Sequence, residues 1–474
     1  HQADPTHHLM KKILTAACAA TIALTAVAEG YQVNSFSARQ EGMGHVGVAM
    51  KLGSESQIFN PGALAFSKET MQLSGSFTAI KSSVTAKTEE GSFDSSNKVS
   101  TPINFAASFR IYDNFYAGVA LYTPYGSSIN WGKAWPGAVL NESVDLKVFT
   151  IQPTFSWRIN KNLSIGAGLM IGWGNVDLNK ALVSSNSMNH LINLMNLPST
   201  MQGKPAPYER YGALSPASVN LVGDSELALG VNVGVLWDAL PNLSFGASFR
   251  SKMNMHVKSG DALVTYANNQ ARNILASTLD NLSYANFDAS MPCPYILTFG
   301  VAYKPIPRLL LAFDVQLNGW GTYKNLKINF PDLPQMYSQD LTKDYHNAMT
   351  YHIGAQYALT HRLDVRCGLM VDCSPCNTDY YNPETPGMTK IEPTVGLSFR
   401  PVKGLSVDLS FMYVHGCGAT GTGEYDDFLA PIYNKQLEAN HLTGILPTLP
   451  DTGKFKADYS LSALIPAVGI SYSF

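Results

Sequence analysis

Charged residues and long apolar runs are both scarce in this sequence. Asp, Glu, Lys and Arg make up 14% of the 474 residues, against about 25% in typical soluble proteins. Beyond residue 28, no window offers 18 consecutive apolar residues, which excludes membrane-spanning helices. The formal net charge is −2 and no basic stripe is present, so nucleic acid is not an expected partner.

Motifs of catalysis are missing as well. The sequence has no G-x-S-x-G, H-E-x-x-H or Walker A motif, and no G-x-G-x-x-G that opens a helix. We therefore expect no enzyme and no cofactor. Cys373 and Cys376 have C-x-x-C spacing, but no second such pair or fitting His pair accompanies them, which favours a local disulfide or no bond over a metal site. Whether the two thiols are joined stays open.

The first 28 residues carry an export signature. Met10-Lys11-Lys12 precedes a short apolar stretch that closes on Ala26-Val27-Ala28. A basic start, an apolar region and an A-x-A end predict a secretory signal peptide, with mature protein beginning at Glu29. Residues 1–9 stand ahead of the natural-looking start at Met10, and their origin is open.

Many later segments alternate between apolar and small or polar side chains. In one of them, Leu409 and Phe411 alternate with Asp408 and Ser410. Transmembrane strands of a barrel have this period of two, with the apolar set facing lipid and the other set facing the lumen. The sequence is also rich in Gly (38 residues), Tyr (23) and Phe (21), as expected for such a protein.

Connections of alternating length distinguish a barrel from a soluble sandwich. Short turns rich in Asn, Asp, Pro or Gly fall at 112–114, 160–162, 238–242, 304–307, 360–361 and 401–404. Long connections fall at 81–98, 130–142, 180–223, 259–284, 324–342, 374–388 and 416–452. Short periplasmic turns and long extracellular loops are typical of outer-membrane barrels. We predict an all-β protein, an antiparallel transmembrane β-barrel of fourteen strands over residues 68–474, in the bacterial outer membrane.

Two terminal features complete this prediction. The last strand ends on Phe474, and a terminal aromatic residue after alternating strands is the usual recognition signal for the barrel-assembly machinery. Residues 29–67 lack the alternation and show no linker, so we expect them to fold into the lumen as a hatch, or plug, because a lumen of this width needs one unless it is an open pore.

Six motifs follow one another along the chain: Gly30 to Phe36, Gly42 to Gly44, Phe59 to Leu64, Tyr122 to Gly126, Phe249 to Ser251 and Phe411 to Gly416. Taken in order, they resemble the FadL-type outer-membrane transporters of long-chain fatty acids and other hydrophobic compounds. The element Asn60-Pro61-Gly62 resembles the family's Asn-Pro-Ala hatch motif, from which Gly62 departs. The resemblance implies a hatch that moves, and lateral release of ligand through a kinked third strand.

The local sequence is compatible with such a kink at Pro124, Tyr125 and Gly126. Proline removes a donor from the ladder and glycine weakens a strand. The alternative is that these residues merely end the strand at the membrane rim.

A buried carboxylate needs a cationic partner, and the resemblance places two lysines near the ligand. Lys180 falls on the family's head-group position just past the fifth strand, and Lys343, opening the tenth strand, falls near another basic position. The alternative for both is a solvated loop edge. Leu191, Leu194 and Met195 belong to an apolar cluster at helical spacing in the loop 180–223, which indicates a binding surface or a helix over the barrel mouth.

We therefore expect passive, ligand-gated uptake of long-chain fatty acids or similar compounds by a monomer that contacts outer-membrane lipid and lipopolysaccharide. Uptake of aromatic hydrocarbons is the near alternative. A surface adhesin or receptor, and an open porin, are the alternatives from other classes.

Overall fold

The computed structural model describes residues 30–474, and the predicted signal peptide and residues 1–9 lie outside this range. The strands, in chain order, are β1 (Met71–Thr78), β2 (Lys81–Thr88), β3 (Gly91–Asp94), β4 (Ile103–Tyr112), β5 (Phe115–Asn130), β6 (Ser143–Arg158), β7 (Leu163–Val183), β8 (Ala217–Asp224), β9 (Ala228–Leu240), β10 (Leu243–Arg250), β11 (Met253–Tyr266), β12 (Asn286–Cys293), β13 (Ile296–Ile306), β14 (Leu309–Asn318), β15 (Asn325–Asn329), β16 (Gln339–Thr342), β17 (Ala348–Ala358), β18 (Leu363–Asp372), β19 (Lys390–Phe399), β20 (Leu405–Gly416), β21 (Ala419–Asp426) and β22 (Thr452–Ser473). The helices are α2 (Ala38–Glu41), η1 (Gly53–Glu55), α3 (Ser56–Phe59), η2 (Pro61–Phe66), η3 (Pro136–Val139), α4 (Ser185–Met201), α5 (Asn269–Leu279), η4 (Asp280–Leu282), η5 (Trp320–Thr322), η6 (Gln335–Tyr337), η7 (Thr378–Tyr380) and α6 (Ala430–Ala439).

These strands form one closed antiparallel barrel, in which β1 pairs with β22. Pieces that follow one another along the same line, such as β8 and β9, together make one stave, and the staves number fourteen. The predicted fold is therefore confirmed. None of the described helices is long and apolar enough to cross a membrane.

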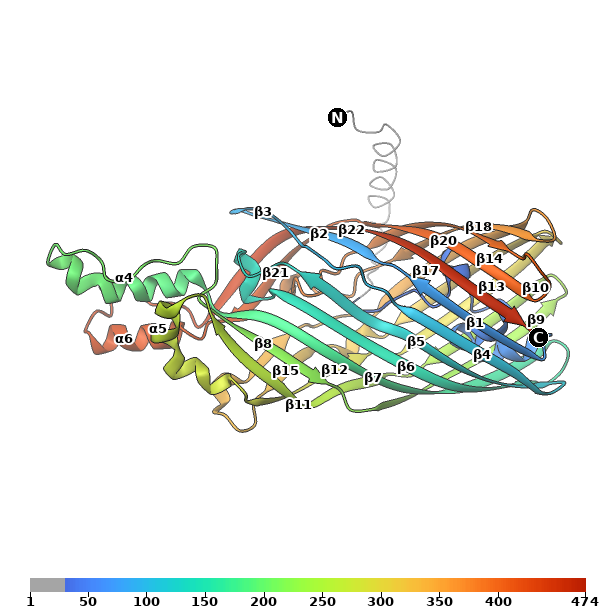
Figure 1. The fold of residues 1–474 in the computed structure, drawn as a ribbon, viewed down its shortest axis with the longest axis horizontal. Helices are drawn as coiled ribbons and strands as arrows, with labels where there is room; N and C mark the ends of the chain where they lie inside the picture. The colour runs from blue at the N-terminus through green and yellow to red at the C-terminus, as the bar shows by residue number, and fades with distance from the viewer. Residues whose placement is uncertain (1–29) are drawn as a thin grey trace, which may run out of the picture.

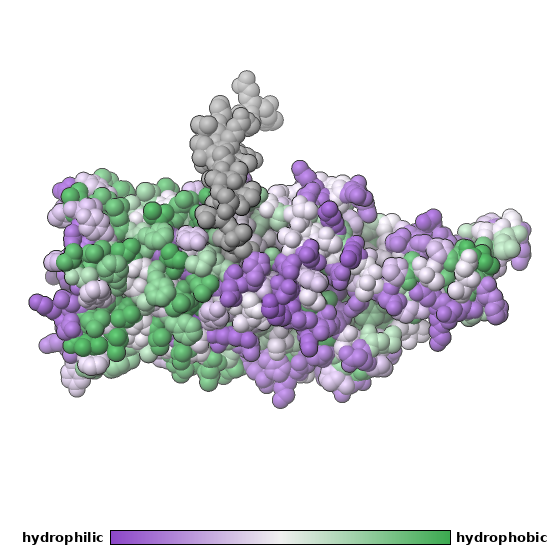
Figure 2. Space-filling model, turned by 180° about the vertical axis from the view of Figure 1, so that it is seen from behind, coloured by the Kyte–Doolittle hydropathy of each residue, from purple (hydrophilic) through white to green (hydrophobic). Residues whose placement is uncertain are grey.

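The predicted alternation reappears as two faces of the wall. On β14, Phe313 is 39% exposed, whereas its neighbour Asp314 is buried in the lumen. On β20, Leu409 and Phe411 face outward, and Asp408 faces inward. On the face seen in Figure 2, apolar side chains form a belt over the half of the barrel that ends in short turns, and hydrophilic side chains predominate over the other half. The apolar half matches a surface in contact with lipid.

The predicted long connections contain more regular structure than expected. The connection 324–342 contains β15 and β16, which pair with each other, and β15 pairs with β12. The wall thus continues beyond the apolar belt, and α4, α5 and α6 extend from this end of the barrel (Figure 1). These pieces are only a few residues long, too short for a period of two to be recognised in the sequence.

Residues 30–67, called the plug below, lie inside the barrel. Asn60 anchors the η2 turn: its side-chain oxygen accepts the N–H of Gly62 at 2.9 Å, and its amide donates to Val48 O at 2.7 Å and to Val235 O of β9 at 2.9 Å. A Cβ on Gly62 would lie 2.8 Å from the backbone oxygen of Gly234. Glycine at position 62 therefore permits a closer approach to the wall than alanine would.

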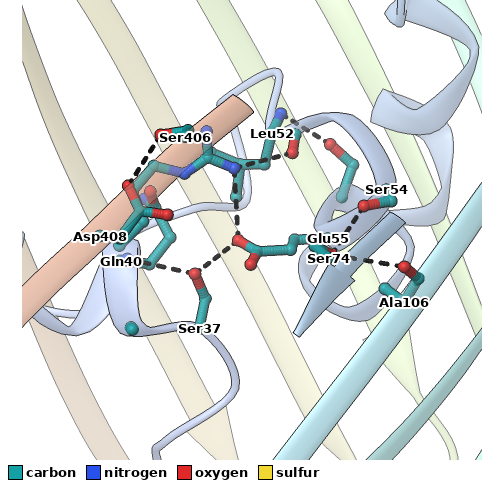
Figure 3. A network of polar contacts seen from close by, with 12 residues as sticks. Ser37, Gln40, Leu52, Ser54, Glu55, Ser74, Ala106, Ser406 and Asp408 are labelled. Carbon is teal, nitrogen blue, oxygen red and sulfur yellow. Dashed lines mark hydrogen bonds and ion pairs between the residues drawn. The ribbon is translucent and has the colours of Figure 1, made fainter. Parts of the chain in front are cut away.

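Buried polar groups hold the plug in place. Arg39 donates to Leu52 O at 3.0 Å and forms an ion pair with Glu55 at 3.3 Å, while Ser54 binds Ser74 of β1 at 2.7 Å (Figure 3). On the opposite side, the amides of Gly47 and Val48 donate to Asp314 at 2.8 and 3.0 Å. Asp314 and Ser74 of the wall thus bind the plug, whereas the Arg39–Glu55 ion pair lies within it.

Candidate ligand site

A small apolar cavity of about 50 Å³ lies among inward-facing residues of the barrel wall. Its lining comes mainly from inward positions of adjacent staves: Leu146, Val148, Val176, Leu178, Leu221, Met255, Val257, Phe287, Ala289, Met291, Leu326 and Ile328. We call it the upper cavity.

Lys180 lies next to the upper cavity in the chain but is not among the residues that line it. It lies within β7, two residues beyond the cavity-lining Leu178 and therefore on the same face. Lys180 is only 4% exposed, and its Nζ donates a hydrogen bond to the side-chain amide oxygen of Gln339 at 3.0 Å. In the described part of the chain, no carboxylate lies within ion-pair distance of Lys180. The expectation that Lys180 follows the strand, and the alternative of a solvated loop edge, are both wrong.

Lys343 is also buried, at 1% exposure, between β16 and β17 rather than at the start of a strand. Its Nζ pairs with the buried carboxylate of Glu384. The charges of Glu384, Asp426 and Lys343 all act on Lys180 through space. The structure therefore brings the two predicted lysines together and adds Glu384, which the sequence analysis missed because it is 41 residues from Lys343.

The predicted apolar cluster in the loop 180–223 forms the helix α4. Leu191 is buried, and Leu194 and Met195 pack partly buried against the same core, which includes Tyr433 and Leu437 of α6. The helix lies beside α6 beyond the barrel end (Figure 1). Of the described residues that line the upper cavity, none comes from α4.

Aromatic rings close the lumen beside the plug. Tyr31 of the plug packs edge-on against Trp320 at 4.8 Å between ring centroids, and against Tyr125 at 6.0 Å and Tyr323 at 5.9 Å. Tyr345 contacts Tyr323 at 4.9 Å. These rings come from three separate parts of the chain, around residues 31, 125 and 320–345, so no local sequence pattern pointed to them.

The wall is incomplete on one side of β5. Its first half pairs with β4, but β4 begins at Ile103, and its last ladder partner toward the outer end of β5 is Leu121. Beyond this point β6 is the only described strand that pairs with β5, with a register shift between Tyr122 and Tyr125 that includes Pro124. The structure thus places an irregularity at the predicted kink.

The plug covers this unpaired edge. Val33 N donates to Pro124 O, and Gly126 N donates to Tyr31 O, both at 2.8 Å. Next to this contact lies a second cavity, of about 2050 Å³ including open solvent. It is lined by Met412 and Ile465, which are buried, and by Val99 and Ile103, which are exposed on the outer surface. We call this cavity the wall opening.

Cys373 and Cys376 are both free thiols in the structure. Within residues 30–474, no group of three or more His, Cys, Asp or Glu side chains is arranged to hold a metal ion. The C-x-x-C spacing therefore reflects a loop that packs its cysteines inward rather than a visible disulfide.

A fourteen-stave antiparallel barrel with an apolar belt and short turns at one end is the architecture of an outer-membrane barrel protein. The model of the family described as outer membrane protein transport protein (OMPP1/FadL/TodX) matches residues 19–474. The chain therefore belongs to this family and is an outer-membrane protein.

Known relatives agree in length as well as in fold. A long-chain fatty acid transport protein from Escherichia coli is 21% identical over 424 residues, covering 86% of this chain and 92% of that one. One from Salmonella typhi is 18% identical over 426 residues with the same coverage. A Pseudomonas aeruginosa FadL homologue of known structure superposes with a TM-score of 0.75 at 15% identity, covering 94% of this chain and all of that one. The Pseudomonas putida toluene transporter TodX gives 0.64 at 16% identity, with coverage of 93% and 99%.

Proposed function

We propose that this protein carries long-chain fatty acids, or hydrophobic carboxylates like them, across the outer membrane by passive uptake. The observation that carries the proposal is Lys180, a buried ammonium without a carboxylate partner in the described chain, on the same strand face as Leu178, which lines the apolar upper cavity. The names of the Escherichia coli and Salmonella typhi relatives support the same cargo.

The energetics favour an amphipathic acid. Each CH₂ group moved from water into the cavity contributes about 0.8 kcal/mol. A buried ammonium paired only with a neutral amide is costly, and a ligand carboxylate offsets that cost. Charge-assisted hydrogen bonds contribute roughly 1.5 to 3 kcal/mol. Lys180 and the apolar lining would therefore select for an anionic head on an apolar tail.

We further propose that ligand leaves sideways through the wall opening. A ligand in the upper cavity reaches this opening when Tyr31 and Val33 of the plug separate from Pro124 and Gly126 of β5. The contact to be broken consists of two backbone hydrogen bonds and the aromatic packing of Tyr31. Release would deliver the ligand directly into membrane lipid, and no chemical step is involved.

Aromatic hydrocarbons are the second candidate cargo. The lining of the upper cavity is almost wholly apolar, and transporters of toluene share this fold. An uncharged ring would not use Lys180, so the response to removal of this ammonium distinguishes the two cargoes.

Uptake of radiolabelled oleate by cells that lack their own transporter and express this protein tests the proposal. We expect uptake by the wild type and a loss of affinity of roughly tenfold or more in Lys180→Ala, from the strength of a charge-assisted hydrogen bond. Lys161→Ala, at an exposed turn, is the matched control and should behave as the wild type. If correctly inserted wild type takes up no oleate, the fatty-acid proposal is refuted; toluene uptake that survives Lys180→Ala would favour the aromatic cargo.

Assembly and oligomeric state remain part of the proposal. Phe474, whose N–H donates to Met71 O at 2.9 Å, is the proposed signal to the assembly machinery. We expect a monomer in contact with outer-membrane lipid and lipopolysaccharide.

A further inference from the structure

The segment from Ser374 to Met388, predicted as an extracellular loop, folds inward between the two lysines and the wall opening. Glu384 is buried and pairs with Lys343. The next residues, Thr385 to Gly387, line the wall opening. One short segment therefore contacts both the proposed head-group site and the proposed exit. We call it the inward loop.

Strand β5 and the residue after it hold the inward loop from the other side. Ser127 Oγ donates to Glu384 O at 3.2 Å, and the Trp131 indole N–H donates to Pro383 O at 2.9 Å. Ser127 lies on the edge of β5 that lacks a β4 partner. The position of Glu384 is thus tied to the strand that borders the wall opening.

The buried charged groups around Lys180 and Lys343 have a net charge that one bound anion would neutralise. Lys180 and Lys343 carry two positive charges and Glu384 carries one negative charge, so the group bears one net positive charge. Asp426, the other acid that acts on Lys180, is exposed, and solvent and salt screen its charge. One ligand carboxylate would balance the group, whereas an uncharged ligand would leave a buried excess charge.

We propose that Glu384 is an internal competitor for the ligand carboxylate, which makes it a specificity-determining residue for anionic cargo. This inference rests on the proposed function. An arriving carboxylate binds Lys180 and competes with Glu384 for Lys343. When Glu384 returns to Lys343, it weakens the hold on the ligand, which can then pass to the wall opening. A ligand shifts such an equilibrium only by its differential affinity for the two states, and an alcohol of equal length has no charge with which to compete.

Ligand binding to the purified protein tests this competition. Laurate and 1-dodecanol have the same chain length and differ in head-group charge, so calorimetry with both separates charge from tail. Glu384→Gln removes the competitor without changing its size. It should bind laurate about tenfold more tightly than the wild type, in keeping with the gain of one charge-assisted contact, and should bind dodecanol with unchanged affinity.

In Glu384→Gln, the maximal rate of uptake should fall although the affinity for the acid rises. Cells with Glu384→Gln should show a lower apparent KM and a lower maximal rate for oleate, because the bound acid is no longer displaced. Glu384→Asp retains the charge and should restore the wild-type rate. Lys343→Met is an independent variant: Glu384 then has only Lys180 as a buried cationic neighbour, and laurate binding should weaken about tenfold.

The proposal is overturned if Glu384→Gln leaves laurate affinity unchanged, or tightens laurate and dodecanol equally. Should Glu384→Gln not insert into the membrane, laurate binding to Lys343→Met decides, and wild-type affinity in that variant overturns the proposal. A wild-type protein that binds no laurate refutes the proposed function itself, which is a different result.

Discussion

Replacing Gly396 with alanine would place a methyl group against the plug. Gly396 lies in β19 between β18 and β20, so ladders on both sides hold its backbone. A Cβ there would lie 2.8 Å from the Cα of Gly42, immediately after α2. An ordinary carbon contact requires roughly 1 Å more. Because the wall is paired on both sides, we expect the plug to shift.

The expected cost follows from overpacking, at roughly 1 to 3 kcal/mol. The nearby amide of Gly44 donates to the Thr394 hydroxyl at 2.8 Å, and those of Gly47 and Val48 donate to Asp314. If the plug opens locally, these amides should exchange with solvent about 5- to 150-fold faster than in the wild type. Hydrogen exchange followed by mass spectrometry of the plug peptides measures this change.

Gly75→Ala is the matched control for this substitution. Gly75 also lies in a strand paired on both sides, β1, but its added Cβ would meet only Asn104 O, at 3.6 Å. Exchange in the plug should therefore remain at the wild-type rate. If Gly396→Ala protects the plug amides as well as Gly75→Ala does, the plug is not held by close contact with the wall.

Two further predictions concern the plug. Burial raises the pKa of Glu41 to about 8, with Ser410 and Glu392 facing it from the wall. The native state thus favours the protonated acid. The free energy of unfolding should therefore be highest below about pH 4.5 and fall, by up to roughly 5 kcal/mol, as the pH rises through 8. Thermal unfolding of Glu41→Gln should lose this pH dependence, and an unchanged profile would contradict the assignment. Gln32 and Tyr125 face each other across the unpaired edge of β5, in a pair type whose Cα atoms lie about 4.5 Å apart, within disulfide reach. Cysteines at both positions, in a Cys293→Ala background, should block oleate uptake when oxidised and restore it when reduced; uptake by the oxidised protein would show that the plug need not leave β5.

The positions of the strands could be predicted from the sequence, because the alternation of side chains and the composition of the turns depend on residues close together in the chain. Phe313 and Asp314 face opposite sides of the wall, as a period of two requires, and the short turns fall where Asn, Asp, Pro and Gly cluster. The same reasoning failed where pieces are short, as in β15 and β16. The end of β7 was also misplaced: the strand continues to Val183, so Lys180 still lies on its inward face instead of in the loop.

The sequence by itself determined the barrel, its fourteen staves and the place of the irregularity at Pro124, since alternation, turn composition and the missing N–H of proline are local properties. Only the tertiary structure decided which groups form the site. Glu384 reaches Lys343 and Tyr31 reaches Trp320 because closing the barrel brings separate staves around one lumen. Burial also sets the surroundings of these charges: Lys180 is removed from water, and its hydrogen-bond partner is the neutral amide of Gln339 rather than a carboxylate.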